Sequence, residues 1–330
     1  MSLFQSHRTS ALAGAAAFAG LILMSAMPGN ACSMCRCGDP TFNALGTDVY
    51  NAGAFRIAMD WERFSKQAGV LPEEEAPDSF KSFARKSATA ADLGRESEVE
   101  NRFTTALSYT FSDRLVAVAR VPFTSRDTTA PEGQMSQNGL SDPELYTLVR
   151  VWSSEFAPGL GRRAWLSVLG GVKTAWGQND AAHQGERLDE HLQPGTGSTD
   201  WFGGFSGVYL FDSRSSFFGS VQYRRTGTND FGYKYGNIGM ANAGYEHKLG
   251  KRFDAALELN FRNAGRDVMD SGGELDPNTG GYLLYVSPRL IVDLSKGLVG
   301  RLAVQVPAVT GLHGVQRERA VANFGLTYLF

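Results

Sequence analysis

The residues of this 330-residue chain best suited to chemistry are its three cysteines, Cys32, Cys35 and Cys37, which lie within six positions of one another. Three thiolates at this spacing can bind a soft metal ion such as Cu(I) or Zn(II). Two of them could instead form a local or intermolecular disulfide in an oxidising compartment. A lipid on Cys32 would leave Cys35 and Cys37 as a pair. The sequence leaves these three possibilities open, and we expect no other cofactor to be required.

Histidine is the side chain most often used as a catalytic base, and its positions here argue against an enzyme. Three histidines lie in expected loops and one beside an expected turn: His183, His191, His313 and His247. A lipid-active barrel enzyme would need a serine and a histidine in contact, oriented by a third polar group, and no His-x-Ser pair occurs. We therefore expect no enzymatic activity and keep the lipid-active enzyme as the least favoured function.

Charged side chains recur at every second position of several apolar segments. In 253–262, Phe253, Leu257 and Phe261 share one face, and Asp254 and Glu258 share the other, because successive side chains of a strand point to opposite faces. A water-filled lumen accommodates such a polar face without desolvation. The alternation places fourteen charged candidates for a solute filter inside a lumen: Arg56, Asp60, Glu62, Arg102, Arg120, Glu144, Arg150, Lys173, Arg224, Asp254, Glu258, Arg262, Arg289 and Arg301.

These fourteen candidates comprise nine cations and five anions, and this basic excess favours anionic solutes. The alternative is a neutralised structural network that plugs a narrow pore. Tyr146, Phe218 and Tyr285 fall on the same inner faces and are expected to narrow the lumen further.

Twelve alternating segments can position these side chains. They are 54–64, 101–111, 115–123, 144–152, 165–176, 201–211, 217–225, 237–247, 253–262, 282–292, 298–306 and 319–330. Short connections alternate with long polar ones such as 65–100, 124–142 and 177–200. Because lipid offers no hydrogen-bond partners, the last strand must pair with the first. The sequence predicts an all-β fold: a monomeric transmembrane antiparallel β-barrel of about 12 strands over 54–330, with short periplasmic turns, long extracellular loops and periplasmic termini.

The start of the chain predicts export. His7 and Arg8 precede an apolar run over 11–27, and small residues favour a cut after Ala31, so 1–31 is predicted to be a signal peptide. A membrane anchor and a lipoprotein signal are the alternatives. The segment 32–53 would then be a cysteine-containing periplasmic segment. No later run is apolar for 18 residues, which excludes helical spans, and the net charge of −2 argues against a nucleic-acid partner.

Aromatic residues mark the expected membrane interfaces and the closing strand. The five tryptophans lie near predicted strand ends, where aromatic girdles sit: Trp61, Trp152, Trp165, Trp176 and Trp201. The alternation of Phe324, Leu326, Tyr328 and Phe330 with small residues resembles the closing strand of Gram-negative outer-membrane barrels. That resemblance implies recognition by the barrel assembly machinery and a location in the outer membrane, among its lipid and lipopolysaccharide.

Three segments carry a more specific likeness: GLSDPEL at 139–145, GGVKTAWG at 170–177 and LQPGTGSTD at 192–200. In this order they resemble an outer-membrane transporter family named for the meta-pathway of phenol degradation. The resemblance covers 139–330 and departs at 174–176, where the family often has Pro-Thr. It implies a channel or transport component for small molecules, hydrophobic or aromatic ones among them, that pass through a polar lumen. The alternative is a protein whose cysteine segment binds a metal ion or docks a periplasmic redox or efflux partner.

Overall fold

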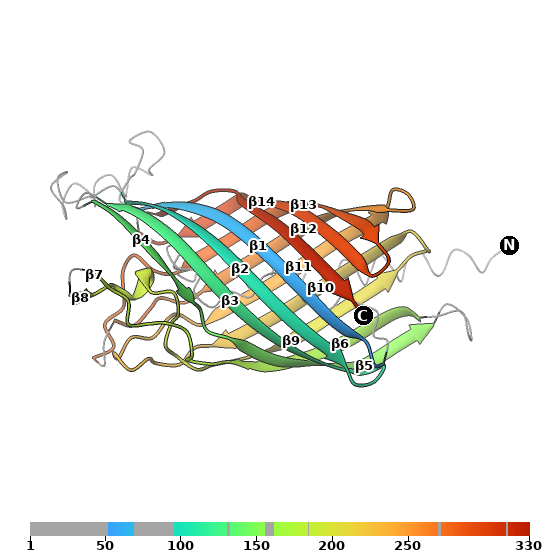
Figure 1. The fold of residues 1–330 in the computed structure, drawn as a ribbon, viewed down its shortest axis with the longest axis horizontal. Helices are drawn as coiled ribbons and strands as arrows, with labels where there is room; N and C mark the ends of the chain where they lie inside the picture. The colour runs from blue at the N-terminus through green and yellow to red at the C-terminus, as the bar shows by residue number, and fades with distance from the viewer. Residues whose placement is uncertain are drawn as a thin grey trace.

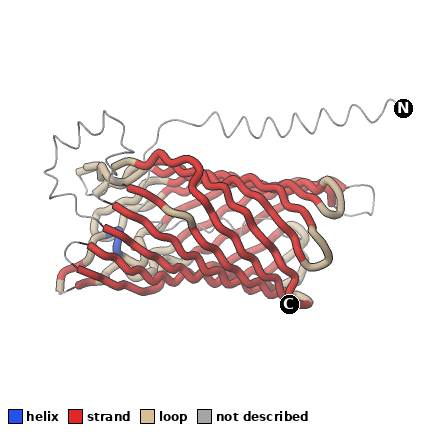
Figure 2. Tube along the Cα trace, turned by 90° about the horizontal axis from the view of Figure 1, so that it is seen from above, coloured by secondary structure: helices blue, strands red, loops and turns tan. Residues whose placement is uncertain are grey.

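The chain folds into one closed antiparallel sheet (Figures 1 and 2). The computed structural model describes residues 52–68, 96–130, 133–155, 162–183, 185–269, 272–314 and 316–330. Twelve long strands of this described part form the wall: β1 Phe55–Ala68, β2 Glu96–Thr110, β3 Leu115–Ala130, β5 Glu144–Glu155, β6 Arg162–Lys173, β9 Asp200–Leu210, β10 Ser215–Arg225, β11 Ile238–Lys248, β12 Phe253–Ala264, β13 Gly281–Ser295, β14 Leu298–Leu312 and β16 Val321–Leu329. The predicted all-β barrel of 12 strands is confirmed.

Shorter elements lie at one end of the barrel wall, where the long connections are. They are β4 Gly133–Leu140, β7 Ala182–His183, β8 Glu186–Arg187, β15 Gln316–Glu318 and the 3-10 helix η2 Glu190–Leu192. The long connections lie at this long-loop end, while short turns and Phe330 lie at the opposite, short-turn end (Figure 1). Within the residues that the structure describes, no helix is long and apolar enough to cross a membrane.

The first and last strands close the sheet. β16 pairs antiparallel with β1, with Phe324 opposite Trp61 and Leu326 opposite Met59, and β1 pairs on its other side with β2. The backbone N–H of Phe330 donates to the carbonyl of Phe55 at 3.0 Å, and the two rings lie 5.5 Å apart. Both edges of the sheet are therefore paired, as an environment without hydrogen-bond partners requires.

Alternation along each strand separates an apolar outer face from a mostly polar interior. Phe103, Phe205 and Leu257 are half-exposed on the outside, whereas Thr104 and Glu258 are buried. The prediction for Trp165 was wrong: its side chain is buried, while Trp152, Trp176 and Trp201 are exposed. Trp165 lies an even number of residues from the buried Lys173 on β6, so both side chains must share the inner face.

One expected loop is largely a strand hairpin. Segment 124–142 was predicted to be a loop, but β3 continues to Ala130 and pairs with β4 from Phe123–Leu140 to Ala130–Gly133. This part of β3 alternates polar side chains on both faces, so the period of apolar residues that reveals the other strands is missing. The hairpin holds residue 142 at the point where β4 gives way to β5.

Candidate functional site: a constriction inside the barrel

The carboxylate of Asp142 joins three segments that are distant in sequence. Its Oδ1 accepts the backbone N–H of Gly177 at 2.9 Å. Its Oδ2 accepts the N–H and the hydroxyl of Thr196 at 2.7 and 2.6 Å and binds Lys173 Nζ at 2.9 Å. The motifs at 139–145, 170–177 and 192–200 therefore meet at one buried group. Neither Asp142 nor Thr196 was among the predicted site residues, and only the motif likeness could have pointed to them.

The connection between β6 and β9, residues 174–199, folds into the barrel; the structure describes all of it except residue 184. Gln193, Thr196 and Ser198 in this inward loop are at most 2% exposed. Two glycines allow its close packing. A Cβ on Gly195 would lie 2.8 Å from the backbone of Gly177, and one on Gly177 would lie 2.7 Å from the backbone of Asp142. This inward loop, residues 174–199, is compactly folded and narrows the lumen at the long-loop end.

Arg126 on β3 attaches the inward loop to the wall. Its guanidinium donates to the carbonyls of His191 and Gln193, the latter at 3.3 Å. The same group binds Glu98 at 3.1 Å and Glu100 at 2.8 Å. A cation paired with two carboxylates thus also satisfies two loop carbonyls, which would otherwise be buried without a donor.

Neighbouring connections hold the opposite side of the loop. Asn229 Nδ2 donates to Glu190 Oε2 at 3.0 Å and to Thr196 O at 3.2 Å. Tyr235 Oη donates to the carbonyl of Glu190 at 2.8 Å. Tyr233 Oη lies 2.9 Å from His191 Nε2 and donates to Asp267 Oδ2 at 2.8 Å. The connections after β10 and β12 therefore hold the loop in place.

Charges of alternating sign line the wall below the loop. Cross-strand pairing places Arg120 beside Glu144, Glu144 beside Lys173, and Lys173 beside Asp200. Arg120 binds Glu144 at 2.8 Å and Lys173 lies 3.2 Å from Asp200. Arg224 bonds Glu144 and lies 4.0 Å from Asp200. Together with Asp142, this ladder contains three cations and three anions, so it carries no net charge.

The structure places all fourteen filter candidates on the barrel interior. Eleven candidates are buried: Asp60, Glu62, Arg102, Arg120, Glu144, Arg150, Lys173, Arg224, Glu258, Arg262 and Arg289. Three are partly buried: Arg56, Asp254 and Arg301. Several form ion pairs: Arg301 with Asp60 at 2.8 Å and Arg289 with Glu258 pair across strands, and Arg102 pairs with Glu100 on the same strand at 2.9 Å.

Sequence reasoning missed six interior charges: Lys66, Glu98, Glu100, Arg126, Asp142 and Asp200. They lie at or beyond the ends of the apolar segments, where no apolar alternation marks the inner face. With them, and with Glu190, Asp267 and Glu318 at the long-loop end, the buried side chains of the described chain comprise nine lysines and arginines against eleven aspartates and glutamates. The basic excess expected from sequence is therefore absent from the interior that the structure describes.

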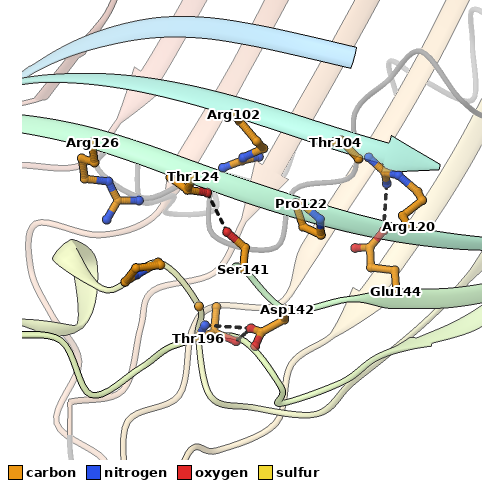
Figure 3. Close-up of a pocket in the computed structure, with 12 residues that line it drawn as sticks. Arg102, Thr104, Arg120, Pro122, Thr124, Arg126, Ser141, Asp142, Glu144 and Thr196 are labelled. Carbon is orange, nitrogen blue, oxygen red and sulfur yellow. Dashed lines mark hydrogen bonds and ion pairs between the residues drawn. The ribbon is translucent and has the colours of Figure 1, made fainter. Parts of the chain in front are cut away.

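A small polar cavity remains between the inward loop and the wall formed by β2 and β3 (Figure 3). It is lined by Arg102, Arg120 and Arg126 on the wall and by Pro194 and Thr196 on the loop, among others. Its volume of about 20 Å³ holds roughly one water molecule. The inward loop therefore packs closely against this part of the wall.

Nearer the short-turn end, apolar side chains fill part of the interior. One cluster consists of Val116, Val118, Tyr146, Leu148, Trp165, Leu169, Phe202, Val208, Phe218 and Ala256. A second cluster lies toward the long-loop end and consists of Tyr285, Phe64, Leu283 and Val321. Tyr146, Phe218 and Tyr285 therefore lie inside and occupy lumen space, so the interior is polar only in part.

The cysteine segment and the histidines are the remaining sequence candidates. The signal segment and Cys32, Cys35 and Cys37 lie outside those residues, and within them no three His, Cys, Asp or Glu side chains form a metal-binding group. Ser215 Oγ contacts His247 Nδ1 at 2.9 Å across β10 and β11. Asp212 accepts the backbone N–H groups of Arg214 and Ser215, which makes it a turn-stabilising group.

No protein-family model and no curated protein matches the chain. The crystal structure of an outer-membrane channel from Pseudomonas putida F1 is similar, with a TM-score of 0.62 and 10% sequence identity over 86% of this chain and 99% of that chain. This chain has the fold of an outer-membrane β-barrel.

Two other solved barrels are more distant in shape. The translocator domain of the autotransporter NalP from Neisseria meningitidis has a TM-score of 0.46 at 10% identity, over 84% of this chain and 89% of that chain. The CymD monoaromatic hydrocarbon channel has a TM-score of 0.43 at 9% identity, over 85% and 89%. Likeness at such identities shows the fold alone, so the resemblance to the phenol-degradation family stays a prediction.

Proposed function

We propose that this chain is a passive channel in the outer membrane of a Gram-negative bacterium, through which small molecules cross by way of the lumen. The observation that carries the proposal is the charge ladder Arg120–Glu144–Lys173–Asp200 beneath an inward loop. A barrel that served only as an anchor needs an apolar outer face, whereas this one also builds a polar constriction inside. Twelve strands enclose a lumen between the packed eight-stranded and the open sixteen-stranded cases.

In the proposed location, the outer face, the short turns and the closing strand each contact a different partner. Outer-membrane lipid and lipopolysaccharide surround the apolar outer face, and the short turns with Phe330 face the periplasm. The barrel assembly machinery recognises the closing strand with Phe324, Leu326, Tyr328 and Phe330. The fourteen interior candidates act as the filter. The structural neighbour from Pseudomonas putida F1 is an outer-membrane channel, and the motif likeness adds hydrophobic and aromatic molecules to the solutes to be tested.

Liposome swelling with purified, refolded protein tests the channel. Proteoliposomes placed in an isosmotic solution of a permeant solute swell, and we expect swelling with small solutes and none with solutes too large for the constriction. The matched control is the same protein denatured by heat before reconstitution. If folded protein permits no swelling and no ion conductance with any solute in the series, the chain is not an open channel.

A second proposal concerns the cysteine segment. The grouping of Cys32, Cys35 and Cys37 within six positions favours a soft-metal site or a docking element for a periplasmic redox or efflux partner. Metal at a fixed stoichiometry in purified protein, absent when all three cysteines are replaced by alanine, would support the metal site. The same variant should retain the swelling activity of the wild type, because the proposed lumen does not use these residues.

A further inference from the structure

The outer face of the barrel has a groove across strands β2, β3, β5 and β6, which are neighbours in the sheet. Its volume is about 380 Å³, within the range of roughly 300–1,000 Å³ that is usual for small-molecule sites. Leu107, Tyr109 and Leu145 line it and are exposed, whereas Ala106 and Leu148, which have the opposite parity on the same strands, are buried. The groove therefore opens away from the lumen.

Small residues form the floor of this outer groove. Cross-strand pairing places Ala117 on β3 opposite Thr147 on β5, and Thr147 opposite Gly170 on β6. Ala119, two positions from Ala117, also lines the groove. A Cβ on Gly170 would meet no atom of the described residues within 4 Å, so the backbone is open to the outside at this point.

Larger side chains form the wall of the groove on the β2 side. Tyr109 lies opposite Ala117, and Leu107 lies opposite Ala119. Phe55 on β1 lies opposite Tyr109 and continues this wall. Because side chains on one face of a sheet project in the same direction, the leucine and tyrosine stand above the alanines beside them.

Aromatic rings place the groove at a defined depth in the membrane. The rings of Tyr109 and Phe111 lie 4.8 Å apart at the end of β2, and those of Phe55 and Phe330 lie 5.5 Å apart. Such aromatic girdles mark the headgroup level of a membrane barrel. The groove begins at this level and extends away from the short turns, into the hydrocarbon layer of the nearer leaflet.

The dimensions of the groove fit one hydrocarbon chain. Three inter-strand spacings separate β2 from β6, which is about 14 Å. The hydrocarbon layer of one leaflet is about 15 Å thick, half of the bilayer core. Eleven residues line the groove, and none of these described residues carries a charge. A protein partner would cover about 20–30 residues, and a headgroup would require polar or charged partners.

Shape, rather than apolarity, distinguishes this groove from the rest of the outer face. Lipid tails are as apolar as leucine, so the hydrophobic effect does not favour one part of that face over another. Dispersion contacts do, because a void beside the floor would lose them and a chain lying in the groove gains them from floor and wall together. A lipid seated there is expected to exchange more slowly than the lipids around it.

We propose that the groove over Ala117, Thr147 and Gly170 binds one acyl chain of a phospholipid from the leaflet at the short-turn end. The inference rests on the outer-membrane location in the proposed function and not on transport, because these residues face away from the lumen.

Native mass spectrometry of barrel extracted in mild detergent counts the phospholipids that stay bound. We expect one phospholipid per wild-type barrel at detergent concentrations that remove the other lipids. The double variant Ala117→Leu, Gly170→Leu fills the groove and should lower the lipid-bound fraction about tenfold or more, because the chain loses its contacts with the floor. Leucine is favourable in hydrocarbon, so folded, heat-modifiable barrel is expected.

The matched control is Gly239→Leu on β11. Gly239 lies opposite the exposed Tyr223, so it faces outward away from the groove. A Cβ there would lie 3.8 Å from the carbonyl oxygen of Asn263, an ordinary contact. This variant should retain phospholipid like the wild type.

Liposome swelling separates the lipid site from the channel, and the double variant should swell like the wild type. Equal lipid retention in the double variant and the wild type, or no retained phospholipid on the wild type, would overturn the site and leave the channel standing. A lipid-free wild-type dimer that the double variant loses would identify a second copy as the occupant and also overturn the proposal. Retained lipid on wild-type barrel that permits no swelling would support the site and overturn the channel.

Discussion

At the scale of single residues, the inward loop depends on buried groups that each satisfy several partners. The Asp142 carboxylate accepts hydrogen bonds from two N–H groups and one hydroxyl of the loop, and it also binds Lys173. The Arg126 guanidinium donates hydrogen bonds to two carbonyls of the loop. Two further carboxylates, Asp267 and Asp276, face His191 at the tip of the loop. His191 Nε2 lies 3.9 Å from Asp267 Oδ2 and 3.6 Å from Asp276 Oδ2.

The shifted pKa values of these two carboxylates imply that the stability of the docked loop depends on pH. Burial raises the pKa of Asp267, against the opposing effects of His191, Gly236 and Tyr233. A raised pKa means that Asp267 stabilises docking most below its ordinary value near 4 and loses that contribution as pH rises through its raised pKa. The hydrogen bond from His191 lowers the pKa of Asp276. Asp276 therefore stabilises docking at pH values above its ordinary pKa, and this contribution is lost only as pH falls through the lowered pKa.

Docking of the inward loop is therefore expected to tighten as pH falls through the raised pKa of Asp267. An imidazolium at His191 would act in the same direction, so Asp267→Asn is the variant that isolates the carboxylate. The protection factors of the 174–199 amides, which correct for the intrinsic pH dependence of hydrogen exchange, should rise on acidification in the wild type and rise less in Asp267→Asn. Asp230→Asn, on an exposed position, is the control. Identical pH profiles for the wild type and Asp267→Asn would contradict this assignment.

At the scale of elements, apolar periodicity predicted the strands that have one apolar and one polar face. The segment 253–262 alternates apolar and polar residues and corresponds to β12. Strand β4 was not predicted, because both faces of the β3–β4 hairpin are polar and show no apolar periodicity. The inward course of 174–199 escaped because it depends on contacts such as Thr196 with Asp142, 54 residues apart, which no local pattern contains. Interior charges at strand ends were missed for the same reason as β4.

The closing strand carries the prediction that belongs to this scale. Phe330 is 67% exposed on the outer face, its ring lies 4.7 Å from that of Tyr328, and its N–H bonds Phe55. Phe330→Asp places a charge on the lipid-facing side at the barrel end, where the intrinsic cost is about 0–1 kcal/mol. A large loss of folded barrel would thus reflect failed recognition during assembly.

Semi-native electrophoresis of outer-membrane fractions measures that loss. We expect Phe330→Asp to give little heat-modifiable barrel and Phe330→Leu, which keeps an apolar end, to give substantially more. Heat-modifiable Phe330→Asp at the wild-type level would contradict the role of this residue in assembly.

At the scale of the whole molecule, the interior is arranged in layers along the barrel axis. The inward loop lies at the long-loop end, the neutral charge ladder follows, and the apolar cluster extends from the ladder toward the short-turn end. Paired charges rigidify the wall without giving it a net sign. An interior without a basic excess gives no preference for anions. The fourteen sequence candidates alone suggested anions, because the acidic residues at strand ends were missing from the set.

We propose that solutes cross this lumen past a constriction held by Asp142, and the bilayer conductance of Asp142→Ala measures whether they do. Removing the carboxylate leaves buried donors unsatisfied at about 1–3 kcal/mol, enough to raise the undocked fraction of the loop about tenfold. We predict larger or more frequent conducting states in Asp142→Ala than in the wild type, and wild-type conductance in Asp230→Ala, an exposed aspartate outside the constriction. Folded Asp142→Ala barrels that conduct no differently from the wild type would contradict the account.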